Sequence, residues 1–434
     1  MMIHVHRSLV RPRTAAVACL VAVAGLAAAC SSTPNASAPR GKGTASASGT
    51  TQKPAPSTTL PPPRWTLIPA DTLGQESPGS TAVWTGNEVL IDHAGCCAGV
   101  GNVQLDAYVP ATNTWKTTAT TPLWPRNGPG VVWTGTDVIA FGGTGSATGG
   151  PPVQPLTDGA AYNPGTDQWH AIAAMPEPFV AAVDGGAVWT GSDVLAWSYD
   201  PTGHETFLSY NPTSNTWKIL PTSGMPAPET SSHMISSRGA GLVWTGSKLI
   251  VWRSNSSGST AAMSNGAAFD PSTNRWTALP APPAPLGIGA AAAWTGKDLV
   301  VWGGSNDTTP VATGAMYDPT ANRWTAMATS PLSPTTNATA VWTGESVFIV
   351  GGQLNVSGAV NLSAAVATFE PSANTWATVA APPALAANPP PAGTPVATAR
   401  VGADLVWTGS QVIMLSGYDG AYQGPRPDGV AWTP

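Results

Sequence analysis

The stretch from Gly289 to Trp324 reads GAAAAWTGKDLVVWGGSNDTTPVATGAMYDPTANRW, and the rest of the chain repeats its layout. It opens with small residues that end in Trp-Thr-Gly and continues with an apolar run that ends in Gly-Gly. A variable polar segment follows, then an aromatic residue, a proline two positions later and a tryptophan seven positions after the aromatic. Self-similarity of this kind along one chain predicts a repeat architecture.

The repeat is marked by two signatures with fixed internal spacing. Trp-Thr-Gly occurs seven times, with its tryptophans at Trp84, Trp133, Trp189, Trp244, Trp294, Trp342 and Trp407. The pattern aromatic-x-Pro-x-x-x-x-Trp occurs six times, ending at Trp115, Trp169, Trp217, Trp276, Trp324 and Trp376. The first signature recurs on average every 54 residues or so, a period in the range of propeller blades.

Each unit holds four short segments suited to β-strands, which we name A to D in chain order. The segments 299–302 and 347–350 are apolar, rich in β-branched residues and bounded by glycine. The Thr-Gly pairs after strand A, and the Asn-Pro or Asp-Pro pairs after strand C, have the composition of tight turns. No segment has the pattern of an amphipathic helix, so the sequence predicts an all-β fold.

The pattern resembles the kelch repeat, in which a double glycine follows strand B and an aromatic and a tryptophan follow at fixed spacing. The double glycine stands at Gly142-Gly143, Gly303-Gly304 and Gly351-Gly352, and half of it at Ser416-Gly417. Three units depart from it, with Asp92-His93, Ser198-Tyr199 and Arg253-Ser254. The resemblance covers residues 64–434 and implies a β-propeller with strand A innermost and strand D outermost. Together with Trp65, which stands in a segment like strand D, fourteen of the nineteen tryptophans occupy the two repeat positions. We therefore expect core packing between blades there rather than ligand stacking.

The two ends of the repeat region complement each other. Arg64 to Pro69 resembles Arg275 to Pro280, so it is expected to be a strand D without its own blade. The last residues, 428–434, match a strand C and stop before a strand D. We therefore predict a seven-bladed propeller of four-stranded blades, closed by pairing the N-terminal outer strand with the C-terminal blade, which removes open sheet edges.

The first residues have the composition of a targeting segment. Arg7, Arg11 and Arg13 precede an apolar run at 14–29, which suits a signal peptide. The Ala-Ala-Ala-Cys sequence ending at Cys30 resembles the lipobox of bacterial lipoproteins, which implies lipidation of Cys30 and an extracytoplasmic protein anchored to the bacterial cell membrane. An ordinary secreted protein cut after Ala29 is the alternative. Residues 30–63 are mostly Ser, Thr, Ala, Pro and Gly, which predicts a disordered tether.

The net charge of the chain limits the classes of molecule that it is expected to bind. Removal of residues 1–29 takes three arginines from a chain of net charge −5 and leaves −8. Charged residues make up only 9% of the chain, and no run of Lys or Arg follows the signal peptide. This balance argues against nucleic-acid binding, and we expect a monomer whose contact with the membrane is the lipid anchor alone.

Cysteine use leaves one pair to interpret. Cys96 and Cys97 are adjacent, and a vicinal disulfide between them would be strained. Outside the cytoplasm the pair is expected to be oxidised. A structural clip is the first interpretation; a redox or ligand-contact role, or a metal fragment with His93, are the alternatives.

All large differences in link length fall on one face of the predicted ring. The distance from the strand A tryptophan to the strand C aromatic varies from 21 to 29 residues, and that from the strand D tryptophan to the next strand A tryptophan from 18 to 31. These B–C and D–A links leave an up-down sheet on the same side, which we call the loop face. Binding loops on a rigid scaffold belong there. The candidate ligand-binding residues on it are His93, Arg126, Arg238, Arg253, His204 and Arg400.

Arginine suits planar, bidentate recognition of carboxylate or sulfate groups. The alternative for each arginine is a pair with a nearby acidic residue. We therefore predict a binding module for a glycan or an envelope protein rather than an enzyme. The second hypothesis is a carbohydrate-active enzyme of the sugar epimerase, mutarotase or galactose-oxidase type.

Galactose oxidase is a seven-bladed kelch enzyme that uses copper, two tyrosines, two histidines and a Tyr–Cys crosslink. Apart from Cys30, the cysteines of the mature chain stand side by side, and no spacing marks such a ligand set. We expect no cofactor, no metal and no catalytic residues.

Overall fold

The computed structural model describes fourteen segments of the chain, and every structural statement below concerns these residues. They are 64–71, 81–92, 104–146, 154–179, 184–199, 205–224, 241–253, 265–284, 286–287, 289–306, 309–355, 361–381, 399–418 and 428–434.

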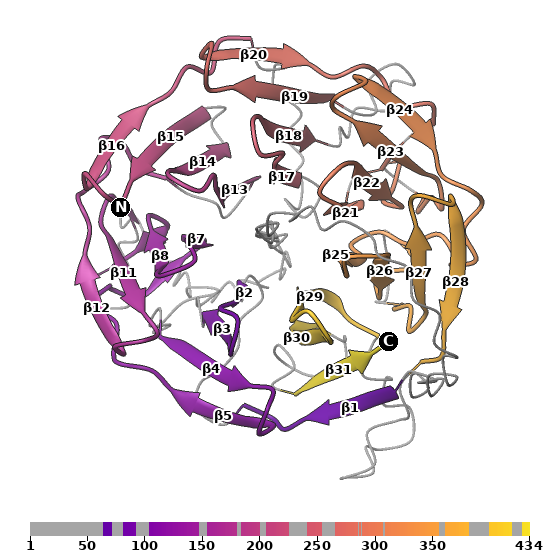
Figure 1. Ribbon diagram of the computed structural model, residues 1–434, viewed down its shortest axis with the longest axis horizontal. Coiled ribbons are helices and arrows are strands. Elements are labelled where there is room, and N and C mark those ends of the chain that lie inside the picture. The colour runs from indigo at the N-terminus through magenta and orange to yellow at the C-terminus, as the bar shows by residue number, and fades with distance from the viewer. Residues whose placement is uncertain are drawn as a thin grey trace, which may run out of the picture.

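Seven four-stranded antiparallel sheets stand around a common axis, as Figure 1 shows. Blade one contains β2 (Ala82–Trp84), β3 (Val89–Asp92), β4 (Leu105–Val109) and β5 (Thr114–Thr117). Blade two contains β7 (Gly130–Trp133), β8 (Val138–Phe141), β11 (Gly159–Asn163) and β12 (Gln168–Ala171). Blade three contains β13 (Asp184–Trp189), β14 (Val194–Tyr199), β15 (Glu205–Asn211) and β16 (Thr216–Ile219). Blade four contains β17 (Gly241–Trp244), β18 (Leu249–Arg253), β19 (Asn265–Asp270) and β20 (Arg275–Ala278).

The remaining blades continue the pattern around the ring. Blade five contains β21 (Ala291–Trp294), β22 (Leu299–Trp302), β23 (Gly314–Asp318) and β24 (Arg323–Ala326). Blade six contains β25 (Thr339–Trp342), β26 (Val347–Val350), β27 (Val366–Glu370) and β28 (Thr375–Val379). Blade seven contains β29 (Val401–Trp407), β30 (Val412–Tyr418), β31 (Gly429–Thr433) and β1 (Arg64–Ile68). A small sheet of β6 (Arg126–Asn127), β9 (Thr144–Gly145) and β10 (Gln154–Pro155) lies beside blade two.

The seven-bladed architecture and its closure are therefore confirmed. Strand A of each blade is innermost and strand D outermost (Figure 1). The N-terminal strand β1 pairs antiparallel with β31, with Trp65 opposite Trp432. The described part of the chain contains no helix, and hence none long and apolar enough to cross a membrane.

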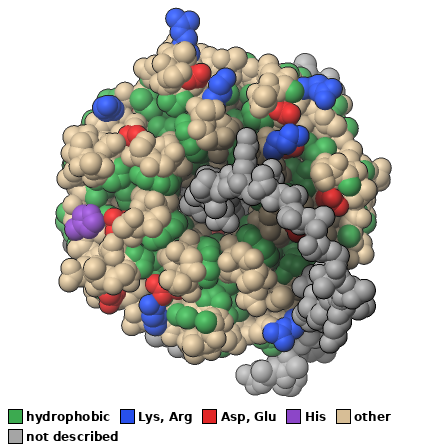
Figure 2. Space-filling view, in the orientation of Figure 1, with side chains coloured by type: hydrophobic (Ala, Val, Ile, Leu, Met, Phe, Trp, Pro, Cys, Tyr) green, Lys and Arg blue, Asp and Glu red, His purple; other side chains and the backbone are tan. Residues whose placement is uncertain are grey.

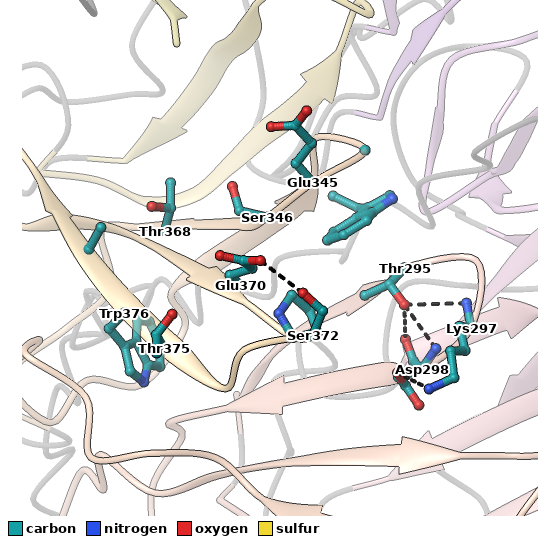
Figure 3. Close-up of a pocket in the computed structure, with 14 residues that line it drawn as sticks. Thr295, Lys297, Asp298, Glu345, Ser346, Thr368, Glu370, Ser372, Thr375 and Trp376 are labelled. Carbon is teal, nitrogen blue, oxygen red and sulfur yellow. Dashed lines mark hydrogen bonds and ion pairs between the residues drawn. The ribbon is translucent and has the colours of Figure 1, made fainter.

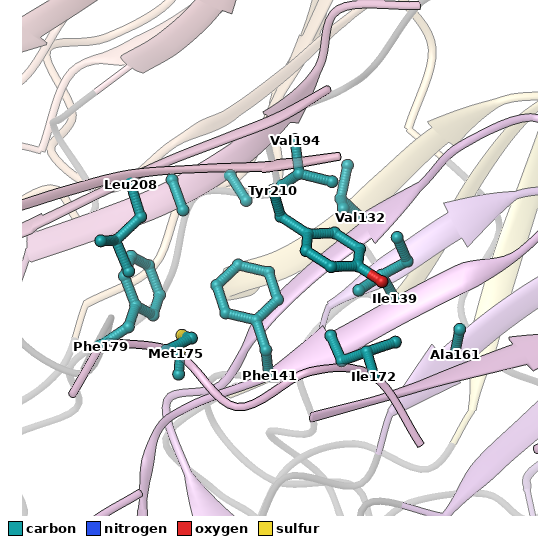
Figure 4. Packing of buried hydrophobic residues seen from close by; sticks show 12 residues of the cluster. Val132, Ile139, Phe141, Ala161, Ile172, Met175, Phe179, Val194, Leu208 and Tyr210 are labelled. Carbon is teal, nitrogen blue, oxygen red and sulfur yellow. The ribbon is translucent and has the colours of Figure 1, made fainter. Parts of the chain in front are cut away.

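Each seam between neighbouring blades is filled by one hydrophobic cluster. Figure 4 shows the seam between blades two and three, where Phe141 packs near Phe179 and Tyr210. The centres of the Phe141 and Phe179 rings are 5.0 Å apart. The strand A and strand D tryptophans pack in or against these clusters, as the repeat pattern predicts.

A ring of seven hydrogen bonds runs around the outer edge of the propeller. Every strand D tryptophan donates its Nε1–H to a main-chain carbonyl that follows strand D of the preceding blade. The acceptor of Trp65 is Ala380, at 2.7 Å, and the acceptor of Trp115 is Pro69, at 2.9 Å. The other five tryptophans repeat this bond at 2.7–3.0 Å. The segment that contains β1 takes part in two of these bonds, as donor through Trp65 and as acceptor through Pro69. The N-terminal strand is therefore bonded to both neighbouring blades, as the other outer strands are.

The face opposite the loop face, which we call the turn face, is built from short and regular turns. The Trp-Thr-Gly threonine of each blade closes the A–B turn; in blade five, Thr295 Oγ1 donates to the carbonyl of Asp298 and accepts its N–H. In the C–D turns an Asn, or Asp167 in blade two, adopts positive φ, which short polar side chains tolerate. Figure 2 shows Lys and Arg side chains spread among Asp and Glu around the ring, without a patch of one sign among the described residues in view.

Candidate functional site

The loop face is shaped by where strand B ends. In blades two, five and six strand B is four residues long and stops at the double glycine, whose residues all have positive φ. The second glycine then donates its N–H to the linker entering the next blade, as Gly304 does to the Thr335 carbonyl at 2.8 Å. A Cβ on Gly304 would collide with the Gly287 carbonyl. Gly304 therefore contacts the backbone of two links, the one that enters its own blade and the one that enters the next, and a side chain would disrupt this packing.

Blades one, three and four, which lack the double glycine, are built differently. In blade three, β14 continues to Tyr199, which pairs with Asp184 of β13 and Glu205 of β15. In blade four, β18 continues to Arg253, which pairs with Asn265. In blade one the buried carboxylate of Asp92 accepts the N–H of Thr81 at 2.6 Å. Strands A, B and C of blade three are each two residues longer than those of blade five, and the additional residues lie at the loop face.

The structure gives Arg126 a partner within its own blade. Its guanidinium group bonds both carboxylate oxygens of Asp158, each at 2.9 Å, and the carbonyl of Gly142 at 2.9 Å. The Arg126 side chain is fully buried, whereas the Asp158 side chain is 51% exposed. This clamp joins the start of the blade, the end of strand B and the start of strand C.

Blade seven repeats the clamp with Arg400. Its guanidinium donates to the carbonyls of Ser416 and Asp428 at 2.8 and 2.7 Å, and to the Asp428 carboxylate at 3.1 Å. Arg126 and Arg400 thus each pair with a nearby acidic residue, which is the alternative considered in the sequence analysis. Ligand binding by either arginine stays a prediction, and we leave both out of the proposed contact surface because their donors already bond the protein.

The other predicted site residues lie outside what the structure describes. His93, His204 and Arg238 are outside the described residues, as are Cys30, Cys96 and Cys97, and for Arg253 only the backbone is described. Their roles stay predictions.

One side chain on the loop face was missed by the sequence reasoning. Trp124 is 46% exposed, and Ile219 is the other large apolar side chain exposed among the described residues. Trp124 lies in the D–A link between blades one and two, between Pro122 and Pro125. Its carbonyl accepts a bond from Nε of the buried Arg126 at 3.0 Å, and its neighbour Leu123 is buried. The sequence did contain a signal for Trp124, because this tryptophan falls outside both tryptophan positions of the repeat and so has no expected place in a seam.

Side chains that could bind a metal ion are dispersed among the described residues. Within them, no three His, Cys, Asp or Glu side chains are grouped as metal binding requires. The only histidine among them is His170, on the outer strand β12.

Comparison with known proteins gives the fold but no family. No protein-family model matches the chain, and no curated protein matches it. Among solved structures, the chain is similar to a novel fungal alcohol oxidase of the AA5 family in complex with copper, with a TM-score of 0.62. The match covers 85% of this chain and 76% of that one at 13% sequence identity. At this identity the likeness establishes a shared propeller fold, on which different functions occur.

Proposed function

We propose that this chain is an extracytoplasmic propeller, tethered to the bacterial cell membrane by lipid on Cys30, that binds a glycan or an envelope protein through its loop face. The observation that carries the proposal is Trp124. An indole exposed to this extent is unusual beside the other described tryptophans, which pack in the seams, and it stands on the face with variable links.

The surroundings of Trp124 suit a rigid contact residue. Two flanking prolines restrict the backbone, and the buried Arg126 holds the carbonyl in place. A contact residue on a restrained backbone loses less entropy on binding than one on a flexible loop. An indole face can stack on the C–H face of a pyranose ring or fill a cavity in a protein partner. His93, His204, Arg238 and Arg253 remain the polar candidates on this face.

Binding is tested with the mature protein on a glycan array and in a pull-down from envelope extract, followed by titration of any ligand found. Trp124→Ala should weaken binding at least about tenfold, the scale of one buried aromatic contact. Ile219→Ala is the matched control, because Ile219 is exposed on the outer strand β16 and should not contact the ligand. Equal affinities of the Trp124→Ala variant and the unaltered protein would refute the proposed contact.

The tether has its own test. Cys30→Ser should release the protein from the membrane fraction or leave it unprocessed. A variant that is still cut after Ala29 and stays with the membrane would rule out the lipid anchor.

The alternative is a carbohydrate-active enzyme of the sugar epimerase, mutarotase or galactose-oxidase type. It is motivated by the fold shared with the copper-containing alcohol oxidase. Metal analysis of the purified mature protein and a turnover screen on free sugars separate the two proposals, since bound copper or turnover would favour the enzyme.

A further inference from the structure

A groove on the turn face, beside blade six, has the chemistry of a second binding site. It is about 690 Å³ in volume, within the range of small-molecule pockets. Figure 3 shows that its lining comes from two neighbouring blades: Lys297 and Asp298 from the A–B turn of blade five, and Glu345, Glu370 and others from blade six. The groove lies on the face opposite Trp124, so it is independent of the function proposed above.

The sequence of strand D differs at blade six, where the groove lies. In the other six blades a residue adjacent to the strand D tryptophan is an arginine, lysine or histidine: Arg64, Lys116, His170, Lys218, Arg275 and Arg323. In blade six both flanking residues, Thr375 and Ala377, are short and uncharged, and both line the groove.

Blade one shows what the missing cation does. There Lys116 reaches across the turn face and forms an ion pair with Glu88 of the A–B turn, at 2.6 Å. Among the described residues no Lys or Arg pairs with Glu345 or Glu370 of blade six. In blade six the repeat counterpart of Glu88 is Ser346, and Glu345 and Glu370 stand at other repeat positions. No ion pair of the Lys116–Glu88 kind neutralises these two carboxylates within the described residues.

The groove combines three kinds of group that recognise sugars. Half-buried Trp342 and Trp376 offer indole surface, and exposed Glu345 and Glu370 offer carboxylate acceptors. Ser372 is a hydroxyl partner, already donating to Glu370 at 2.8 Å. Burial raises the pKa of Asp298. The ammonium group of Lys297, whose Nζ lies 3.6 Å from Asp298 Oδ2, offsets part of this rise.

The balance of three carboxylates against one ammonium disfavours anionic ligands. A metal ion is also a poor fit, because these carboxylates are not grouped as a metal site among the described residues. We propose that the blade-six groove binds a saccharide without acidic groups, stacked on the accessible indole surface of Trp342 or Trp376 and held by hydroxyl bonds to Glu345 and Glu370.

The test is a titration of the full mature protein with each of five sugars, with binding detected by ligand-observed NMR. The sugars are glucose, galactose, mannose, N-acetylglucosamine and glucosamine. We expect at least one sugar to bind. Thr375→Arg introduces the residue that blades four, five and seven carry natively, so it should fold, fill the groove and weaken binding at least tenfold. Glu370→Gln should weaken binding several-fold. Thr216→Arg makes the same substitution at the matching position of blade three and should leave affinity unchanged.

Four outcomes would overturn the inference. The first three are no binding of any sugar on the panel, preference for a sulfated sugar over its neutral parent, and equal effects of Thr375→Arg and Thr216→Arg. Sugar binding that is lost in Trp124→Ala and kept in Thr375→Arg would place the ligand on the loop face, which supports the proposed function and contradicts this groove.

Discussion

At the residue scale, the turn between strands C and D shows how one side chain serves two blades. Asp167 has a φ of 53°, and the asparagines at 113, 215, 274, 322 and 374 adopt the same backbone conformation. Asp167 Oδ1 accepts the hydroxyl of Tyr162 at 2.8 Å within its blade and the N–H of Ala119 in the preceding blade at 2.8 Å. The sequence predicts the turn from Pro and Asn, but the bond across the seam depends on a neighbour about 50 residues away, which local pattern cannot reveal.

A pH prediction follows for this residue. The Ala119 N–H, and secondly the Tyr162 hydroxyl, lower the pKa of Asp167. A carboxyl whose pKa is lowered by folding stabilises the protein above its unfolded pKa, about 3.9, and loses that contribution as the pH falls through its folded pKa. Asp167→Asn keeps an acceptor but removes this titration.

The measurement is the thermal midpoint of both proteins at pH 7 and at pH 3. The advantage of the unaltered protein over Asp167→Asn should shrink at pH 3. Because other carboxyls such as Asp318 also have lowered pKa values, only the difference between the two proteins is informative. Parallel curves for the two proteins would contradict the account.

At the element scale, the Arg–Asp clamps tie three segments of one blade. The sequence shows the likeness of 158–164 and 428–434 and places Arg126 and Arg400 before strand A, but it does not show that the arginines turn inward. The carboxylate stands only about 30 residues away along the chain, and either orientation fits the local pattern. The guanidinium turns inward because it also donates a hydrogen bond to a main-chain carbonyl at or near the end of strand B. This carbonyl belongs to Gly142 in blade two and to Ser416 in blade seven.

The two clamps should differ in strength. Asp428→Asn leaves a buried guanidinium facing a side chain that is only 15% exposed, and should cost about 3 kcal/mol of unfolding free energy. Asp158 is 51% exposed, so water can replace its carboxylate, and Asp158→Asn should cost about 1 kcal/mol or less. Chemical denaturation of both variants checks the order. The reverse order would show that exposure of the partner does not control these pairs.

At the scale of the whole molecule, the spacing of the repeat together with its resemblance to the kelch repeat predicted the ring. The blade count, the inner position of strand A and the use of the first strand to complete the last blade are confirmed. The candidate site stays a prediction. Two of its arginines prove to be clamps, and Trp124 was not selected because its exposure depends on how a D–A link folds over blade two. The blade-six groove depends on residues shorter than their repeat equivalents, a difference that acquires meaning only once the neighbouring blade is in place.

Closure of the ring by β1 completes two of the seven seams, those between blades six and seven and between blades seven and one. This strand places Ile68 in the seam between blades seven and one, and Trp65 against Phe348 at 6.2 Å between ring centres. Without it, β31 becomes an exposed edge strand, which favours aggregation.

The most direct test compares two shortened forms of the mature chain, one beginning at residue 60 and one beginning at Gly74, by thermal unfolding. The form beginning at residue 60 should melt like the full mature protein. The form beginning at Gly74 should melt more than about 10 °C lower, because it loses the buried Ile68, the half-buried Trp65 and Leu67, and the pairing of β1 with β31. Removal of one buried side chain alone costs roughly 2–5 kcal/mol. Equal melting of the two forms would contradict closure of the propeller by its N-terminal strand.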